Sequence, residues 1–168
     1  SAESTISAIL KLGNALGLPV EATDLANDVE DSFDELATQV AAGPKPKAMF
    51  ILSNRDGRLN VAGRGTGAHG VIELAGAVNV MGDAYEGYKQ ASAEAIIQAA
   101  PDVIIMMTGR GNHASKEAEI MAIPAISQTP AGQISAFSLV DSAALGFGPR
   151  TPDLLTDLRA NILAEISE

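Results

Sequence analysis

The sequence predicts an α/β domain of three layers, with helices on both sides of a mostly parallel sheet and a long helical segment before it. A buried strand is predicted at 48–53, and the continuous apolar run at 103–107 is typical of a central parallel strand that is buried on both faces. Segments with apolar residues at helical spacing alternate with these strands, as at 93–100. Strands that alternate with helices favour a parallel sheet.

Composition limits the classes of partner. The 168 residues are 46 % hydrophobic and only 4 % aromatic, so the core must be built from aliphatic side chains and methionine. The formal net charge of −10 argues against nucleic acids and anionic membranes, because both attract lysine and arginine. Without cysteine there is no disulfide, thiolate metal site or cysteine nucleophile. No apolar run approaches the roughly 20 residues of a membrane-spanning helix, so we expect none.

The first part of the chain, residues 1–43, is predicted to be helical. A short amphipathic helix ends near Gly17, and Pro19 begins a second helix. The opposite face of this second helix is acidic, which indicates a solvated surface. A stiff Gly-Pro-Lys-Pro-Lys segment follows, and we place the domain boundary there, between 1–43 and 44–168. The apolar stripe of the second helix consists of Leu25, Val29, Phe33, Leu36 and Val40.

Residues 54–66 are expected to form a long loop with a turn at Asp56-Gly57. Thr66 is positioned to cap a helix that Gly76 ends, and 79–81 is long enough only for an edge strand. The next helix begins at Ser92, with Glu94 in its first turn, where the helix dipole favours an acid. Pro101 ends that helix before the strand at 103–107.

The remaining elements are weaker until the last helix. We expect a helix at 115–121 and strands at 125–128 and 134–140, separated by a turn. A loop at 146–150 leads to a helix with Thr151 as its N-cap and a proline at its first position. The buried face of this helix is predicted to contain Leu155, Leu158, Ile162 and Ile166.

The segment Gly65–Gly70 satisfies the G-x-G-x-x-G pattern of dinucleotide-binding proteins. That interpretation needs a strand directly before the motif, whereas the predicted strand ends at Ser53. The acid expected on a second strand is also missing. A nucleotide-binding enzyme domain therefore stays an alternative. The other interpretation is that these glycines only form the turn before a helix, whose N-terminus could hold an anion such as a carboxylate.

The sequence offers little support for metal binding or catalysis. His69 and His113 do not have a metal-ligand spacing, which argues against a zinc site. Each is either a surface residue or a single axial ligand to a haem iron. No G-x-S-x-G elbow marks a serine nucleophile, so we expect neither an enzyme nor an intrinsic metal.

Arginines that follow predicted strands are the most informative polar residues. Because parallel strands end at the same edge of a sheet, several of them could surround one crevice and bind carboxylates or phosphates. The alternative is that each is a separate surface residue. Tyr85 and Tyr88, on either side of Gly87, are pocket walls or half-buried phenols. The arginines are Arg55, Arg64, Arg110 and Arg150.

Several motifs together resemble a known family. The segments 92–97 and 100–105 look like the signature of ABC-transporter substrate-binding proteins whose lobes are joined by a rigid helix. Three further segments, 62–68, 127–132 and 145–152, resemble the periplasmic hemin-binding proteins of haem uptake systems. The resemblance covers the chain from about Ile6 to its end. It implies a monomeric periplasmic protein that is not an enzyme, carries haem as transported ligand and delivers it to a membrane permease.

The resemblance also implies which parts are present. Residues 1–43 correspond to the helical connector between lobes and 44–168 to the C-terminal lobe, so we expect an N-terminal lobe in the intact protein. The family's axial tyrosine belongs to that other lobe, and Tyr88 is its pseudo-symmetric counterpart here. Glu94 matches the glutamate that docks to the permease. A ferric siderophore or a corrinoid is the alternative cargo. The residues expected at the ligand are Asn54, Arg55, Arg64, Thr66, Tyr88 and Arg110.

Overall fold

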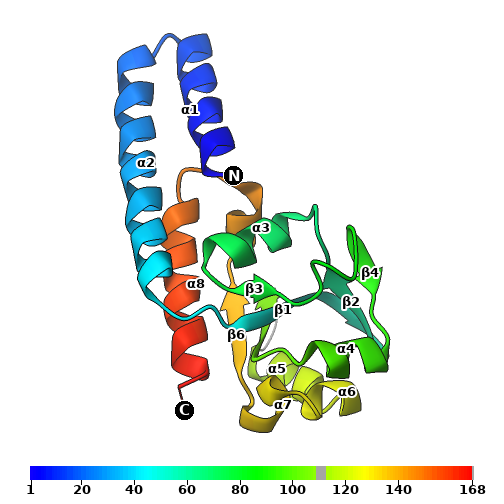
Figure 1. Cartoon of the computed structure of the whole chain (residues 1–168). Coiled ribbons are helices and arrows are strands. Elements are labelled where there is room, and N and C mark those ends of the chain that lie inside the picture. Colours follow the sequence, from blue (N-terminus) through cyan, green and yellow to red (C-terminus); the bar gives the residue numbers. More distant parts are fainter. Residues whose placement is uncertain (109–112, 168) are drawn as a thin grey trace.

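The computed structural model describes residues 1–108 and 113–167 and confirms the α/β fold class. Figure 1 shows two long antiparallel helices that project as a hairpin from an α/β body. The body contains one sheet with helices on both faces. No helix in the described part of the chain is both long and apolar enough to cross a bilayer.

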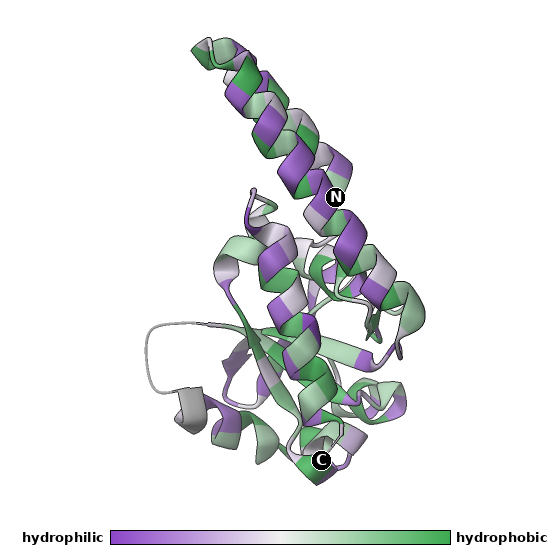
Figure 2. Cartoon of the chain, turned by 90° about the vertical axis from the view of Figure 1, so that its left-hand side faces the viewer, coloured by the Kyte–Doolittle hydropathy of each residue, from purple (hydrophilic) through white to green (hydrophobic). Residues whose placement is uncertain are grey.

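The projecting hairpin consists of α1 (Ala2–Leu16) and α2 (Pro19–Ala42), which confirms the two predicted helices. Gly17 ends α1 in the left-handed conformation, with φ of 73°. The helices approach closely at Gly13, where a Cβ atom would lie 2.0 Å from the Cβ of Ala22. Leu25, predicted to be in the buried stripe, is instead 43 % exposed. Figure 2 shows apolar residues continuing along the hairpin beyond the body.

The sheet is mixed but mostly parallel. Its strand order is β4-β2-β1-β5-β6, and β3 pairs with the beginning of β1. The pairs β1–β5, β5–β6 and β1–β3 are parallel, whereas β1–β2 and β2–β4 are antiparallel. The strands are β1 (Lys47–Arg55), β2 (Arg58–Ala62), β3 (Val78–Asn79), β4 (Tyr88–Gln90), β5 (Val103–Met107) and β6 (Phe137–Val140).

The helices of the body form two outer layers. The helices α3 and α8 and the 3-10 helix η1 lie on one side of the sheet together with the lower half of α2. The helices α4, α5, α6 and α7 lie on the other side. Their bounds are α3 (Gly67–Leu74), α4 (Ala93–Ala99), α5 (His113–Met121), α6 (Pro124–Ser127), α7 (Pro130–Ile134), η1 (Ser142–Gly146) and α8 (Thr151–Glu165).

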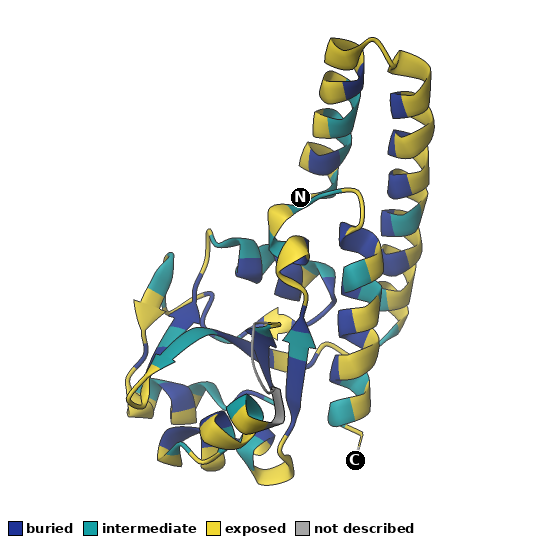
Figure 3. Ribbon diagram, turned by 180° about the vertical axis from the view of Figure 1, so that it is seen from behind, coloured by how far each residue is buried: buried dark blue, intermediate teal, exposed yellow. Residues whose placement is uncertain are grey.

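The core lies on both faces of the central strands. Residues 48–51 of β1 and 103–105 of β5 are completely buried, as their continuous apolar runs predict. Figure 3 shows these strands and the inner faces of the covering helices as buried, whereas the outer faces of the hairpin are exposed. The body therefore provides a rigid frame for the loops at its surface.

Three predicted elements were wrong. The segment 54–66 is not a loop, because Arg58–Ala62 forms β2 and pairs antiparallel with β1 around the Asp56-Gly57 turn. The segment 125–128 is not a strand but belongs to α6, and the predicted strand at 134–140 begins only at Phe137. Both α6 and α7 begin with proline at the first helical position, which fixes a helical φ before a short helix.

The last helix, α8, carries a charged residue in the core. Leu155, Leu158 and Ile162 are buried as predicted, but Arg159 on the same face is only 5 % exposed. Its Nη1 donates to the carbonyl of Ala75 at 3.0 Å and its Nη2 to the carbonyl of Gln39 at 3.3 Å. These carbonyls belong to the C-terminal ends of α3 and α2, so one guanidinium connects three helices.

Candidate functional site

The turn after β2 is held by backbone hydrogen bonds to the segment before β4. The amide of Arg64 donates to the carbonyl of Tyr85 at 2.8 Å, and the amide of Gly87 donates to the carbonyl of Arg64 at 2.8 Å. The amide of Gly63 donates to the carbonyl of Gly87 at 2.9 Å. Arg64 is exposed, so a backbone held on both sides presents a cationic side chain at the surface.

Gly63 is required at this turn for steric reasons. A Cβ atom at this position would lie 2.2 Å from the carbonyl oxygen of Tyr85, a backbone atom that cannot rotate away. We expect Gly63→Ala to lower the free energy of unfolding by roughly 2 kcal/mol, because overpacking forces the two segments apart. Gly146→Ala is the matched control, since nothing lies within 4 Å of the Cβ added there. Urea unfolding of both variants tests this, and equal midpoints would refute it.

Thr66 acts on the local backbone. Its Oγ1 donates to the carbonyl of Gly63 at 2.9 Å and accepts from the amide of His69 at 3.1 Å. The hydroxyl therefore caps α3, as the sequence predicts, and its proton is already used within the turn. Thr66 thus fixes the shape of the turn next to Arg64 and has at most one lone pair left for a ligand.

The end of η1 and Phe147, the residue after it, pack over the start of α3. The carbonyl of Leu145 would lie 3.1 Å from a Cβ atom at Gly67, and the ring of Phe147 would lie 3.0 Å from one at Gly70. The hydroxyl of Thr5, near the start of α1, donates to the carbonyl of Phe147 at 2.9 Å. Residues 63–66, 85–87 and 145–147 therefore form one surface beside the base of the hairpin, which we name the Arg64 face.

His69 lies behind this face, half-buried in the first turns of α3. The side chain of Asn79 is oriented by two backbone contacts, because its Oδ1 accepts from the amide of Met81 and its Nδ2 donates to the carbonyl of Ala62. The same Nδ2 lies 3.2 Å from Nδ1 of His69. Nδ1 is then the acceptor, and the neutral ring carries its proton on Nε2.

Two other predicted ligand residues lie at the far end of the β1–β2 hairpin. Arg55 is the last residue of β1 and pairs with Arg58 across the turn. Six residues of extended chain, about 3.3 Å each, separate Arg58 from Arg64, so the two ends are roughly 20 Å apart. Arg64 lies far from Arg55 because β2 runs antiparallel to β1 and leads the chain away from the turn between them. The structure therefore does not bring Asn54 and Arg55 together with Arg64 and Thr66.

The polar groups of Asn54 already have partners within the chain. Its Nδ2 donates to Oε1 of Glu119 at 2.6 Å, and its Oδ1 accepts from the amide of Gly57 at 2.9 Å. Arg55 is exposed and borders a shallow hollow of about 560 Å³ that Arg58 and Gln90 also line. The turn end of the β1–β2 hairpin is thus a second polar surface, distinct from the Arg64 face.

The remaining predicted site residues are spread over three places. Tyr88 is half-buried on β4, opposite Ala62, and so lies next to the Arg64 face. Glu94 is exposed in the first turn of α4, at the same end of β4 as Gln90. Arg150 is the exposed N-cap residue of α8. Arg110 lies outside the described residues.

The glycine motif at 65–70 has a different setting from a dinucleotide-binding turn. A strand does precede it, because β2 ends at Ala62, which the sequence did not predict. However, β2 is antiparallel to β1, whereas β3 after the helix is parallel to β1. The unit β2–α3–β3 is therefore not the parallel βαβ unit that the motif needs. Among the described residues, no group of three or more His, Asp or Glu side chains could hold a metal ion.

Comparisons with known proteins agree on one family. Residues 1–143 match the family described as "Periplasmic binding protein". No curated protein sequence matches the chain. The periplasmic heme-binding protein BhuT, solved with two hemes, superposes with a TM-score of 0.89 at 30 % identity over 99 % of this chain and 64 % of its own.

Two further solved structures give the same result. The periplasmic heme-binding protein RhuT from Roseiflexus sp. RS-1 has a TM-score of 0.87 at 29 % identity, over 99 % of this chain and 64 % of its own. A periplasmic heme-binding protein from Pseudomonas aeruginosa has a TM-score of 0.83 at 31 % identity, over 96 % of this chain and 60 % of its own. The chain thus spans less than two thirds of the length of these structures.

Proposed function

Because the chain belongs to the periplasmic binding protein family, we propose that the intact protein is the periplasmic substrate-binding component of an ABC importer. We propose that its cargo is haem, held between two lobes and delivered to a membrane permease. The residues described here form the C-terminal lobe and the helical connector. The similarity to heme-binding relatives over nearly all of this chain supports the cargo.

The observation that carries this proposal is the position of the Arg64 face. It lies beside the base of the α1–α2 hairpin, where the Thr5–Phe147 contact joins the connector to the body. A ligand held between this lobe and another would meet an exposed guanidinium on a turn that the backbone of Tyr85 holds, beside α3, where the ring of Phe147 packs on Gly70. Haem offers propionates for the guanidinium and an apolar ring for the aromatic side chains.

The apolar surface of the hairpin supports a second unit packed against it. Large apolar side chains there are 43 % to 68 % exposed, and a groove between the helices is lined almost entirely by apolar residues. Exposed apolar surface of this kind is typical of a face that another unit covers. In the proposed protein the N-terminal lobe is that unit. The exposed residues are Leu12, Leu16, Leu18, Val20 and Leu25.

We assign the residues of this lobe as follows. Arg64 pairs with a propionate, Thr66 holds the turn that presents it, and Tyr88 supports the wall from β4. Asn54 and Arg55 lie too far from Arg64 to contact the same ligand group and are not assigned to the haem. His69 presents Nδ1 to Asn79, so in this arrangement it is a donor through Nε2 rather than an iron ligand.

The cargo is tested by a thermal-shift panel on the full-length protein. Hemin, a ferric hydroxamate siderophore, cobalamin and NAD are compared at equal concentrations. We expect hemin to raise the melting temperature most, because only a ligand that binds the native state stabilises it. A larger shift with the siderophore or with cobalamin would change the cargo and keep the family, and a shift with NAD alone would contradict both.

Glu94 is proposed to dock the protein to its permease. Its own backbone amide and the side chain of Ser92 hold the pKa of its carboxyl below the usual range. Like an ordinary glutamate, the group is ionised at neutral pH, and the lowered pKa means that its charge persists to a lower pH than usual. An exposed carboxylate at a helix start is therefore available for a partner's arginine.

We expect Glu94→Gln to weaken docking of the full-length protein to nanodiscs that carry the permease–ATPase complex about tenfold, with haem affinity unchanged. Docking of the wild type should decline at acid pH in parallel with protonation of Glu94. Biolayer interferometry follows docking from about pH 7.5 down to about pH 3, more than one unit below the ordinary glutamate pKa of about 4.3, so that the titration of a carboxylate with a lowered pKa falls inside the range. Asp153→Asn in the first turn of α8 is the control. Equal binding of both variants would refute docking through Glu94.

A further inference from the structure

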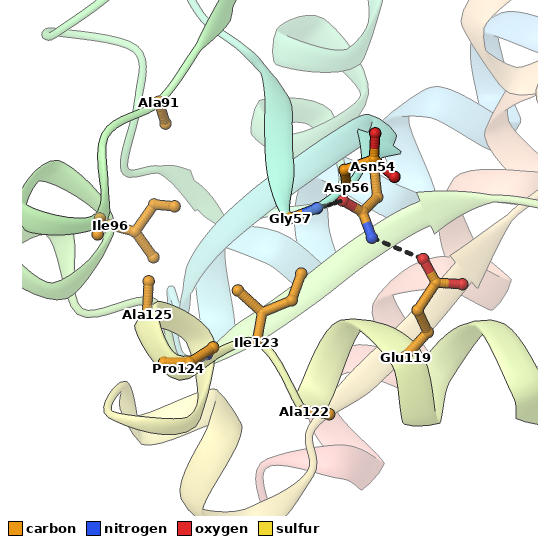
Figure 4. Close-up of a pocket in the computed structure, with 11 residues that line it drawn as sticks. Asn54, Asp56, Gly57, Ala91, Ile96, Glu119, Ala122, Ile123, Pro124 and Ala125 are labelled. Carbon is orange, nitrogen blue, oxygen red and sulfur yellow. Dashed lines mark hydrogen bonds between the residues drawn. The ribbon is translucent and has the colours of Figure 1, made fainter.

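A separate cavity of about 550 Å³ opens beside α4, on the side of the sheet that the Arg64 face does not occupy. Figure 4 shows it between the β1–β2 turn, α4 and the segment that joins α5 to α6. None of the residues of the Arg64 face lines it. The lining residues on which the argument rests are Asn54, Asp56, Ile96, Glu119, Ile123 and Ala125.

The cavity combines an apolar wall with two acids. Ile96 and Ala125 are buried at 3 % and 6 % exposure, and Ile123 is half-buried beside them. The carboxylates of Asp56 and Glu119 stand on the opposite side, and the described lining contains no lysine or arginine. A side chain with an aliphatic stem and a cationic end fits both halves, because the stem covers apolar surface while the charge meets a carboxylate.

The acidic side of the cavity is built from two elements. Nδ2 of Asn54 donates to Oε1 of Glu119 at 2.6 Å and so joins the β1–β2 turn to α5. Oδ1 of Asn54 accepts from the amide of Gly57, which fixes the side-chain amide from its other end. The hydrogen bond with Asn54 involves Oε1 of Glu119, so Oε2 can still accept from a partner.

The cavity also continues the surface that carries Glu94. Ala93 and Ile96 line the cavity, and Glu94 lies between them on the exposed side of α4. Glu94 and the acids of the cavity, which α4 adjoins through Ala93 and Ile96, would give a partner two contacts for cations and so fix its orientation as well as its affinity. A single exposed ion pair contributes little, whereas a stem inserted into an apolar cavity adds buried contact area.

We infer that this cavity is a second anchor for the permease and takes an arginine or lysine side chain, with its apolar neighbours, from that protein. The inference rests on the proposed docking through Glu94. The aliphatic stem packs on Ile96 and Ile123, and the cation pairs with Asp56 and with Oε2 of Glu119, the oxygen that does not accept from Asn54. Binding through both Glu94 and the cavity makes the docking surface specific for a basic, partly apolar segment.

The test measures docking of the full-length protein to nanodiscs carrying the permease–ATPase complex, with empty nanodiscs as blank. Ala122→Trp fills the mouth of the cavity from an exposed position, and Ala118→Trp, exposed on α5 outside the lining, is its control. Glu119→Gln removes the charge but keeps an oxygen for Asn54. Glu117→Gln is its control, because Glu117 lines a different hollow beside β6. Hemin affinity is measured for each variant.

We expect Ala122→Trp to weaken docking roughly tenfold and Glu119→Gln about threefold, with both controls and all hemin affinities like the wild type. If both cavity variants dock normally while Glu94→Gln does not, the cavity is not an anchor and the proposed function stands. If Glu94→Gln also docks normally, the proposed docking itself is wrong. A loss of hemin affinity in Ala122→Trp would make the cavity a ligand site and overturn the inference.

Discussion

Replacing Arg159 by methionine is expected to lower the free energy of unfolding by about 3 to 5 kcal/mol. The guanidinium donates to the carbonyls of Ala75 and Gln39, at the C-terminal ends of two helices. Methionine fills much of the space but leaves both carbonyls without this donor, and a hydrogen bond to a charged group contributes roughly 1.5 to 3 kcal/mol. The negative ends of the two helix dipoles also lose their counter-charge.

The measurement is urea unfolding of the chain, followed by circular dichroism. Arg58→Met is the control, because Arg58 is exposed at the β1–β2 turn and its replacement should stay within about 0.5 kcal/mol. Arg159→Lys is expected to fall between the two, since an ammonium cannot reproduce the fork of the guanidinium. If Arg159→Met unfolds at the wild-type urea concentration, the guanidinium does not hold α2 and α3 to the body.

Arg159 also fixes how the α1–α2 hairpin meets the body. The residue joins α2 to the C-terminal end of α3, the helix that follows the turn with Arg64. Gly43 and Gly76 lie against the guanidinium so closely that a Cβ at either would come within 2.2 and 2.4 Å of it. The angle between α2 and the body is therefore fixed at a packed contact.

The second large effect is expected for ligand affinity. Arg64→Ala in the full-length protein should weaken hemin binding roughly 10- to 100-fold, because it removes a charge-assisted pair to a propionate. Arg55→Ala is the matched control, since it removes the same side chain at the other end of the β1–β2 hairpin. We expect its hemin affinity to be within about twofold of the wild type, as is usual for a residue outside the site.

Fluorescence quenching during hemin titration gives both affinities, and urea unfolding checks that each variant is folded. Equal losses in Arg64→Ala and Arg55→Ala would show that both ends of the hairpin reach the ligand. A loss in Arg55→Ala alone would place the haem at the far end and contradict the assignment of the Arg64 face.

Much of the fold could be predicted because its signals are local. The helical hairpin, β5 and α8 follow from apolar spacing and from proline and glycine at helix ends. The strand β2 was missed because Arg58–Ala62 is short and carries only three buried residues, although the Asp-Gly turn before it is a hairpin signal. The helices α6 and α7 were missed because each has only one or two turns.

The candidate site could be predicted only in part. The rule that parallel strands end at one edge placed Arg55 and Arg64 together, and the unpredicted reversal at β2 separates them. The sequence does indicate that Arg159 is buried, because it lies four residues after Leu155 and three before Ile162, on the buried face of the helix. No local pattern in the sequence indicates the Asn54–Glu119 contact, since 65 residues separate the two side chains.

The central claim is that the intact protein holds haem against the Arg64 face, and a hemin titration of the full-length protein followed by its Soret absorption tests it most directly. We expect a shifted Soret band that grows until hemin reaches a fixed stoichiometry with the protein, and the same titration of Arg64→Ala to lack this sharp end point. A Soret band that stays that of free hemin throughout the titration would contradict the account.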